Sequence, residues 1–358
     1  MVKAKNSLRE YFYSLITDER KGFWASIFKF FLLLASFIYG LGIRVILLGY
    51  KVGISRSRRL NCKVISIGNI TWGGTGKTTL IQMLAKRLAA DGRKPAVLIR
   101  GYGEDEDRIL KRALLDIPVF VGRDRIKCGN RAIDEYSVDT ILLDDGFQHW
   151  RLDRDVDILT INSLDPFGNG HLIPRGILRE PVAGLKRADL FFLTKTDLVK
   201  KERLSGIKER LKRLRPDALL VESIHKPVCL YSPAKRERVG LDAIRGEPVA
   251  LLSGIGDPKS FQRTVEALGA KIVLNFTFLD HHRYTTKDLK SLVGSCLASD
   301  VRTVITTQKD MIRLQDILGQ GSKTPDTLGV HILALQIQLE VTKGEEILDG
   351  LLSTIFSG

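Results

Sequence analysis

Residues 71–78, TWGGTGKT, combine glycines, a lysine and a hydroxyl side chain at a spacing that suits phosphate binding. An apolar run precedes them and a helix-forming run follows. In such a strand–loop–helix unit, main-chain N–H groups and the helix dipole surround a phosphate, Lys77 adds positive charge, and the Thr78 hydroxyl is placed for Mg²⁺. The usual pattern opens with glycine, whereas this chain has threonine there. The expected nucleotide-binding residues are Thr71, Trp72, Gly73, Gly74, Thr75, Gly76, Lys77 and Thr78.

A second apolar run, TILLDD at 140–145, ends in two adjacent carboxylates, Asp144 and Asp145. In P-loop proteins Mg²⁺ is held, directly or through water, at the end of a strand near the phosphate loop. A turn that begins Asp-Asp-Gly would account for the same residues without a function. Together with the loop at 71–78, the pair favours a metal site formed by Asp144, Asp145 and Thr78.

A third motif, LTKTDLV at 193–199, is similar to the TKxD sequence with which GTPases read guanine. In that interpretation Asp197 would bind the edge of the base. A lysine at a strand end, followed by a helix-capping aspartate, also arises by chance. We therefore expect ATP to be preferred over GTP.

The elements that must position these residues alternate between strand and helix from residue 61 to 235. This alternation predicts an α/β fold of the P-loop NTPase type, with a mostly parallel, doubly wound sheet. A second series of strands and helices predicts a smaller α/β domain at 236–358. The stretch 222–247, with Pro227, Pro233 and mixed charges, is expected to be the linker.

The first 60 residues form a separate, apolar and basic segment. They hold eleven Lys and Arg but three acidic residues, within a chain whose formal net charge is +15. The uncharged run Phe30–Ile43 has 14 residues, fewer than the roughly 20 that span a bilayer, although including Lys29 lengthens it to 22. A buried core helix is the alternative. Flanking cations and aromatics favour a helix at a lipid surface, and no nucleic-acid-binding motif accompanies the charge.

Five motifs in one order resemble the tetraacyldisaccharide 4′-kinase family. They are TWGGTGKT (71–78), RGYG (100–103), ILLDDGFQH (141–149), ILREPV (177–182) and LDHHRY (279–284). The resemblance extends from the apolar N-terminus to about residue 315, and DDGFQH after a P-loop is its most specific part. It implies ATP- and Mg²⁺-dependent phosphorylation of the 4′-hydroxyl of an acylated glucosamine disaccharide 1-phosphate, a step in lipid A biosynthesis. It also implies an active site in the cleft between the domains, at the cytoplasmic face of the bacterial inner membrane.

The resemblance also implies roles for single residues. Asp105 matches the family's catalytic base and His281 its catalytic histidine, with Lys77 at the phosphates. The family's proline after the base is absent here, so Asp107 is an alternative to Asp105, and His282 is an alternative to His281. Arg179 and Glu180 match an Arg-Glu-Pro element near the metal, which adds Glu180 to the expected metal-binding residues. A carboxylate would take the proton of the sugar hydroxyl, and a histidine would orient and tune it.

Two other classes of protein share some of these features. A partition-type or maturation-type P-loop ATPase or GTPase switch also has GGxGKT, but it has no use for the apolar N-terminal helix or for a DHH motif in a second domain. A nucleic-acid-binding protein would suit the positive charge. More than half of that charge, however, lies in the apolar N-terminal segment, so we expect no nucleic acid as partner and a lipid surface instead.

Overall fold

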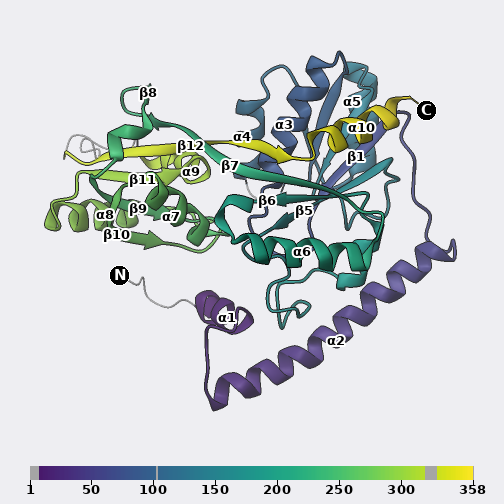
Figure 1. Cartoon of the computed structure of the whole chain (residues 1–358), viewed down its shortest axis with the longest axis horizontal. Coiled ribbons are helices and arrows are strands. Elements are labelled where there is room, and N and C mark those ends of the chain that lie inside the picture. The colour runs from purple at the N-terminus through teal and green to yellow at the C-terminus, as the bar shows by residue number, and fades with distance from the viewer. Residues whose placement is uncertain (1–7, 102–103, 319–328, 358) are drawn as a thin grey trace. The chain divides into compact units, whose positions relative to one another are not determined.

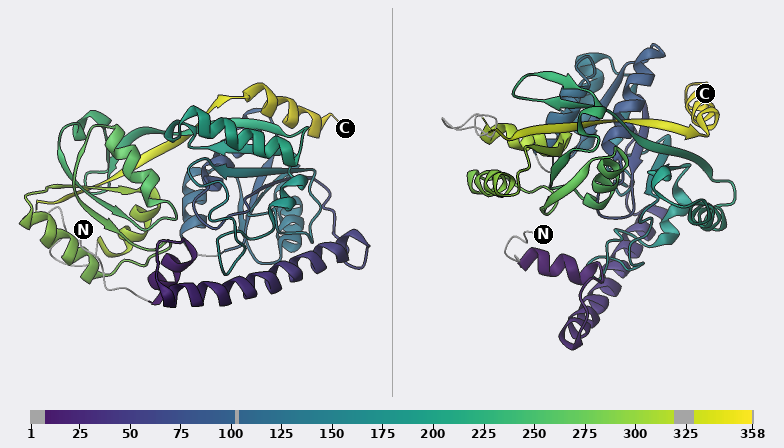
Figure 2. Two further views of the ribbon diagram at one scale, coloured as in Figure 1. Left: turned by 60° about the horizontal axis from the view of Figure 1, so that its bottom comes forward. Right: turned by 60° about the vertical axis from the view of Figure 1, so that its left-hand side comes forward.

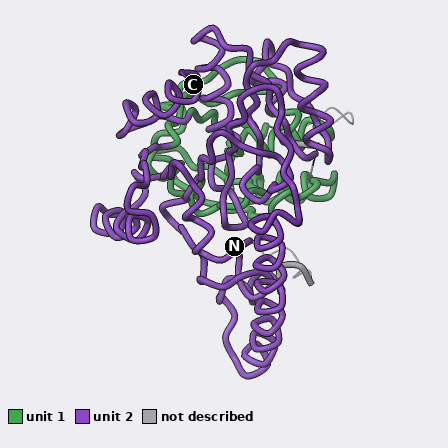
Figure 3. The backbone as a smooth tube through the Cα atoms, turned by 90° about the vertical axis from the view of Figure 1, so that its right-hand side faces the viewer, with its two compact units in different colours: residues 1–5, 103–109, 225–338 green, residues 6–102, 110–224, 339–358 purple. Residues whose placement is uncertain are grey.

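The computed structural model describes residues 8–101, 104–318 and 329–357, and the side chains of all of these except residues 8–10 and 104–106. The chain forms two compact units (Figure 3). The smaller unit includes residues 103–109 and 225–338, and the larger unit includes residues 6–102, 110–224 and 339–358.

A parallel sheet organises the larger unit. Its strands, in order across the sheet, are the first part of β7 (Leu219–Ser232), β6 (Leu190–Thr194), β5 (Val156–Asn162), β1 (Lys63–Gly68), β4 (Thr140–Asp144), β2 (Pro95–Ile99) and β3 (Val119–Val121). Strands of this kind, buried on both faces, have near-continuous apolar sequences, as TILLD in β4 and LFFLT in β6 do. The predicted mostly parallel α/β sheet is confirmed.

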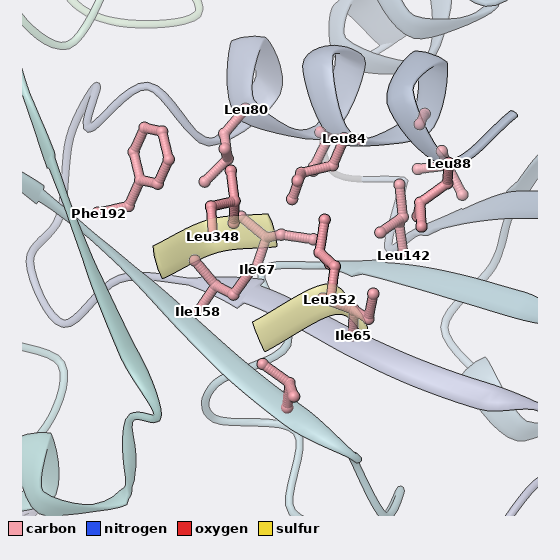
Figure 4. Packing of buried hydrophobic residues seen from close by; sticks show 14 of the residues in the cluster. Ile65, Ile67, Leu80, Leu84, Leu88, Leu142, Ile158, Phe192, Leu348 and Leu352 are labelled. Atoms are coloured by element: carbon pink, nitrogen blue, oxygen red, sulfur yellow. The ribbon is translucent and has the colours of Figure 1, made fainter. Parts of the chain in front are cut away.

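Helices cover this sheet and bury its side chains. They include α3 (Lys77–Ala90), α5 (Arg125–Tyr136), α6 (Lys201–Leu214) and α10 (Glu345–Phe356). Figure 4 shows Leu348 and Leu352 of α10 among residues of α3 and β1, in a cluster of buried side chains. The C-terminal residues 339–358, expected in the smaller domain, therefore belong to the larger unit.

The smaller unit has its own parallel strands, in the order β10 (Lys271–Thr277), β9 (Pro248–Ser253), β11 (Thr303–Thr307) and β12 (His331–Lys343). Its helices include α7 (Pro258–Ala267), α8 (Thr286–Ala298), α9 (Gln308–Leu318) and the start of α4 (Glu104–Ala113). Side chains cap the starts of α7 and α8: Asp257 accepts from Ser260 N, and Thr285 forms a capping box with Asp288.

The stretch 222–247 is not a linker, which corrects the expectation from its prolines and charges. It contains most of β7, then β8 (Glu237–Val239) and the 3₁₀ helix η3 (Leu241–Ile244). Pro227 lies between the registered pairs of β7 with β6, at residues 219–222, and those with β8, at residues 230–232, so it interrupts neither ladder.

The N-terminal segment forms α1 (Leu8–Ile16) and α2 (Phe23–Lys51), the long purple helix in Figures 1 and 2. By length and composition α2 could cross a membrane, and little of it is buried. Its buried side is narrow and includes Ser36 and Gly40. The Ser36 hydroxyl donates to the carbonyl of Leu172 (2.8 Å), and a Cβ at Gly40 would lie only 2.7 Å from Leu172 Cδ1. A small-residue face thus docks α2 onto the larger unit.

Candidate active site

The phosphate loop has the predicted order of strand, loop and helix. It leads from β1 to α3, whose N-cap Gly76 has φ 91°, while Gly73 has φ 123°. These left-handed conformations are costly for residues with a Cβ and explain the two glycines. Thr71 pairs with Leu178 in an isolated bridge, and Trp72 N donates to Ile177 O (2.7 Å). The loop is therefore anchored at the position where a glycine is usual.

Lys77 lies between two side chains that fix its ammonium group. Its Nζ donates to Asn69 Oδ1 (3.1 Å) and lies 3.4 Å from Asp145 Oδ1. Asp145 is also bound by the Arg179 guanidinium at 2.6 Å and has φ 54° directly after β4. Burial opposes ionisation of Asp145, but the charges of Lys77 and Arg179 outweigh it and hold its pKa well below the usual range. The carboxylate therefore stays ionised at neutral pH.

Asp144 ends β4 next to the phosphate loop, as expected. Strands β1 and β4 are neighbours, with Ile67 opposite Asp144, so the acids and the loop share one edge of the sheet. Arg125, itself buried, donates from Nη2 to the Asp144 carbonyl (3.1 Å), and burial lowers the pKa of this guanidinium to about 10. Thr78 lies in the first turn of α3. The structure thus brings Thr78, Asp144 and Asp145 to the same edge.

Glu180, unlike Asp145, is completely buried. Its side chain is 0% exposed, its Oε1 accepts from Gln148 Nε2 (2.8 Å), and its Oε2 accepts from Arg187 Nη2 (2.8 Å). Gln148 Nε2 also donates to the main-chain carbonyl of Asn69 (3.0 Å). Burial raises the pKa of Glu180, and Arg187 opposes that rise. This chain of contacts fixes Asn69, which in turn holds Lys77.

Three of these residues, Asn69, Gln148 and Arg187, were not expected from the sequence as site residues. Gln148 lies within the DDGFQH motif, which offered a signal for it, whereas Asn69 and Arg187 belong to no motif noted above. The last residue of that motif, His149, is neutral at pH 7, because burial and the charges of Arg125 and Arg154 lower its pKa to about 4. Among the described residues, no group of three or more His, Cys, Asp or Glu side chains could hold a metal ion.

The TKTD motif lies against the phosphate loop. Lys195 is buried, adopts φ 58°, and donates from Nζ to the Gly74 carbonyl (3.2 Å), while the Thr194 hydroxyl donates to the Thr75 carbonyl (3.0 Å). Asp197 is exposed in the short 3₁₀ helix η2 (Thr196–Leu198). The motif is therefore a structural support of the loop, and its part in base selection stays a prediction.

The second set of expected residues belongs to the smaller unit. His281 has φ 60°, a conformation rare for a residue with a side chain, and its Nδ1 lies 3.4 Å from Arg313 Nη2. His282 instead stacks on Phe278, with ring centroids 4.3 Å apart, and contacts Asp288. Asp105 lies in the first turn of α4, but its side chain is outside the described part of the chain. Helix α4 is tied to α9 by Arg108, whose two terminal guanidinium nitrogens donate to the Asp316 carboxylate at 2.8 and 2.9 Å.

The fold and the loop together define a P-loop nucleotide-binding protein. The model of the family described as tetraacyldisaccharide-1-P 4′-kinase (LpxK) matches residues 28–112 and 105–355. The chain is 37% identical over 329 residues to the tetraacyldisaccharide 4′-kinase of Anaeromyxobacter dehalogenans (85% of this chain, 84% of that protein). It is 34% identical to that of Halothermothrix orenii, with coverage of 96% and 97%.

A solved structure agrees with these matches. The crystal structure of LpxK from Aquifex aeolicus in complex with ATP superposes with a TM-score of 0.66 and 25% identity, covering 92% of this chain and 99% of that one. The chain belongs to the tetraacyldisaccharide 4′-kinase family. It is an enzyme of the kinase class, and the switch-type ATPase or GTPase is not favoured.

Proposed function

We propose that the chain transfers the γ-phosphoryl group of ATP to the 4′-hydroxyl of tetraacyldisaccharide 1-phosphate, an acylated glucosamine disaccharide of lipid A biosynthesis. The observation that carries this proposal is the phosphate loop with Lys77 held 3.4 Å from Asp145, in a chain of the 4′-kinase family. In this proposal Lys77 and the main-chain N–H groups of the loop bind the phosphates. They stabilise the charge that spreads over the transferring group.

The residues at the edge of β1 and β4 fit Mg²⁺. Thr78 offers a hydroxyl and Asp144 and Asp145 offer carboxylates, the hard oxygen donors that this ion prefers, directly or through water. Bound Mg²⁺ would neutralise charge on the nucleotide phosphates. Glu180, a metal-binding candidate from the sequence, is fully buried, and its two oxygens accept from Gln148 and Arg187, whereas the Asp145 side chain is 32% exposed. We propose that Glu180 supports Asn69 and Lys77 rather than the metal.

The acceptor hydroxyl needs a base. In this proposal the carboxylate of Asp105 takes the 4′-hydroxyl proton while the oxygen forms its bond to the γ-phosphorus. The bond from phosphorus to the β–γ bridging oxygen breaks, and ADP leaves. His281 orients and tunes the base. Its strained φ of 60° supports a functional role, because such strain persists where the surroundings impose it and gathers at active sites. Asp107 and His282 are the alternatives that mutagenesis would separate.

The acylated substrate lies in a lipid layer, and α2 suits such a surface. Its exposed side carries large apolar residues, among them Phe23, Trp24, Phe31, Phe37 and Ile38. We propose that α2 attaches the enzyme to the cytoplasmic face of the bacterial inner membrane, where nucleotide is available. Basic residues after the helix, such as Arg56, Arg58 and Arg59, would add attraction to anionic lipids.

One experiment tests the proposed reaction directly. The full-length protein is incubated with γ-labelled ATP, Mg²⁺ and the disaccharide 1-phosphate in detergent, and the lipid is separated by chromatography. We expect label in the lipid, and none with Lys77→Ala or without Mg²⁺. Label released only as free phosphate would instead indicate a nucleotide hydrolase of the switch class.

A further inference from the structure

The smaller unit contains a buried ion pair that the proposed reaction does not use. Asp310 is 0% exposed and the Arg313 side chain 5%, and Arg313 Nη1 donates to Asp310 Oδ1 (3.1 Å) and to the Gly254 carbonyl (2.7 Å). The hydroxyls of Tyr284 and Thr307 donate to the same carboxylate, at 3.0 and 2.7 Å. Burying such a pair adds little or nothing to stability compared with apolar residues, because desolvation offsets the attraction. A buried pair that adds little stability can instead serve to position a neighbouring side chain.

The second terminal nitrogen of the Arg313 guanidinium, Nη2, contacts a histidine. Arg313 Nη2 lies 3.4 Å from His281 Nδ1. A guanidinium has donors and no acceptor, so the contact is a hydrogen bond only when Nδ1 carries a lone pair. In a neutral histidine the proton must then be on Nε2, because the partner of one ring nitrogen decides the state of the other. The contact thus selects one of the two neutral tautomers.

The neighbouring histidine shows that this arrangement is specific to His281. The ring of His282 stacks on Phe278, and its Nε2 lies 3.2 Å from Asp288, the residue that completes the capping box of α8. Packing and capping account for His282. The His281 side chain is 40% exposed, so its ring can meet a substrate or a second protein group.

We propose that Arg313, held by Asp310, is a positioning residue that keeps His281 in the Nε2–H tautomer and so presents Nε2 as a hydrogen-bond donor. This rests on the proposed function, in which His281 orients the carboxylate base: a carboxylate accepts, and only a protonated Nε2 can donate to it. Lysine could not replace arginine in this role. One ammonium group can replace Nη1 at Asp310 and Gly254, but it lacks a second nitrogen fixed at the angle that reaches His281.

The test reads the tautomer and the activity separately. Long-range ¹H–¹⁵N spectra of the full-length protein, labelled at its six histidines, report the protonated ring nitrogen, and His281→Gln assigns the signal. We expect the Nε2–H tautomer in the natural chain. In Arg313→Lys, which keeps the buried charge, we expect a mixture of tautomers and a kcat at least about tenfold lower with KM for ATP unchanged. Tyr284→Phe is the matched control: it removes a bond to Asp310 but none to His281, and should preserve both tautomer and kcat.

The outcomes are distinguishable. An unchanged Nε2–H signal in Arg313→Lys, or an unchanged kcat in spite of a changed tautomer, would overturn the positioning role. Loss of the tautomer in Tyr284→Phe as well would overturn it too, because general damage to the cluster would then be the cause. If the tautomer changes in Arg313→Lys but His281→Ala has normal activity, the contact does set the tautomer. That result would nevertheless refute the proposed part of His281 in the reaction.

Discussion

The hydroxyl of Tyr39, in the middle of α2, donates a 2.7 Å hydrogen bond to the main-chain carbonyl of Arg179. The guanidinium of the same arginine binds Asp145, which lies 3.4 Å from Lys77. The main-chain N–H of Arg179 donates to Ile70 O (2.8 Å), just before the phosphate loop. The apolar N-terminal helix and the phosphate site thus share one residue, so the seating of α2 bears on the position of the Asp145 carboxylate.

We expect Tyr39→Phe to lower kcat by about fivefold, since one hydrogen bond contributes about 1 kcal/mol. Binding to vesicles should be unchanged, because the substitution does not reduce the apolar surface of α2. Tyr50→Phe on the same helix is the control, as its ring contact with Trp150 survives. Steady-state rates on vesicle-bound substrate, with sedimentation of the vesicles, measure both quantities. Equal losses of kcat in Tyr39→Phe and Tyr50→Phe would show that the hydrogen bond from Tyr39 to Arg179 has no specific effect on the phosphate site.

Lys77→Ala and Asp145→Ala should each lower turnover by at least about 10². Lys77→Ala removes positive charge that stabilises the transferring phosphoryl group, and Asp145→Ala removes the carboxylate proposed to hold Mg²⁺ and found beside Lys77. The control is Lys86→Ala, at an exposed lysine of α3, the helix that Lys77 begins, and it should leave turnover unchanged. The measurement is kcat, with circular dichroism to confirm folding. Near-normal turnover of a folded Lys77→Ala protein would remove the phosphate loop from the mechanism.

The phosphate loop and the acids beside it could be predicted from the sequence, because each depends on a few consecutive residues. Examples are a glycine that needs positive φ and an acid that follows an apolar strand. Asp144 and Asp145 were expected beside residues 71–78 and lie there. The supports could not be predicted in the same way. Arg187 reaches Glu180 across the 3₁₀ helix Val182–Arg187, whose geometry no short motif specifies. Lys195 reaches Gly74 over 121 residues, a contact that depends on the order of the strands in the sheet. Helix α10 is a further example: its apolar pattern predicts a helix but does not indicate against which part of the protein Leu348 is buried.

ATP should bind more tightly than GTP, in spite of the TKTD motif. The Lys195 ammonium group donates to the Gly74 carbonyl and so supports the phosphate loop. Of the TKTD motif, only Asp197 would then contact the nucleotide base. Competition of each nucleotide against labelled ATP measures the preference, and Asp197→Asn should change it little. Tighter binding of GTP that Asp197→Asn abolishes would move the chain toward the GTPase class.

Attachment to the membrane should depend on α2. Deleting residues 1–55 should move the protein from the membrane pellet to the supernatant, and Phe31→Asp with Ile38→Asp, two exposed positions seven residues apart, should do so while keeping the docked face. Leu115→Asp, at an exposed leucine outside α2, is the control. High salt should weaken the binding in part if α2 lies flat, because about 1 kcal/mol per surface cation is screened, whereas a spanning helix would be insensitive to salt. An unchanged pellet fraction after the deletion would place the attachment elsewhere.

Asp105 and His281 should act as one unit in catalysis. If the histidine orients the base, each single alanine variant removes most of the shared effect, and the double variant should cost little more than the worse single one. The pH–rate profile of Asp105→Ala should also lose its acidic limb, since the group that must be deprotonated is gone, while affinity for ATP stays near normal. Fully additive losses would argue for independent roles. If Asp105→Ala loses little activity while Asp107→Ala is inactive, the base is Asp107. The same comparison of His281→Ala with His282→Ala would decide which histidine orients the base.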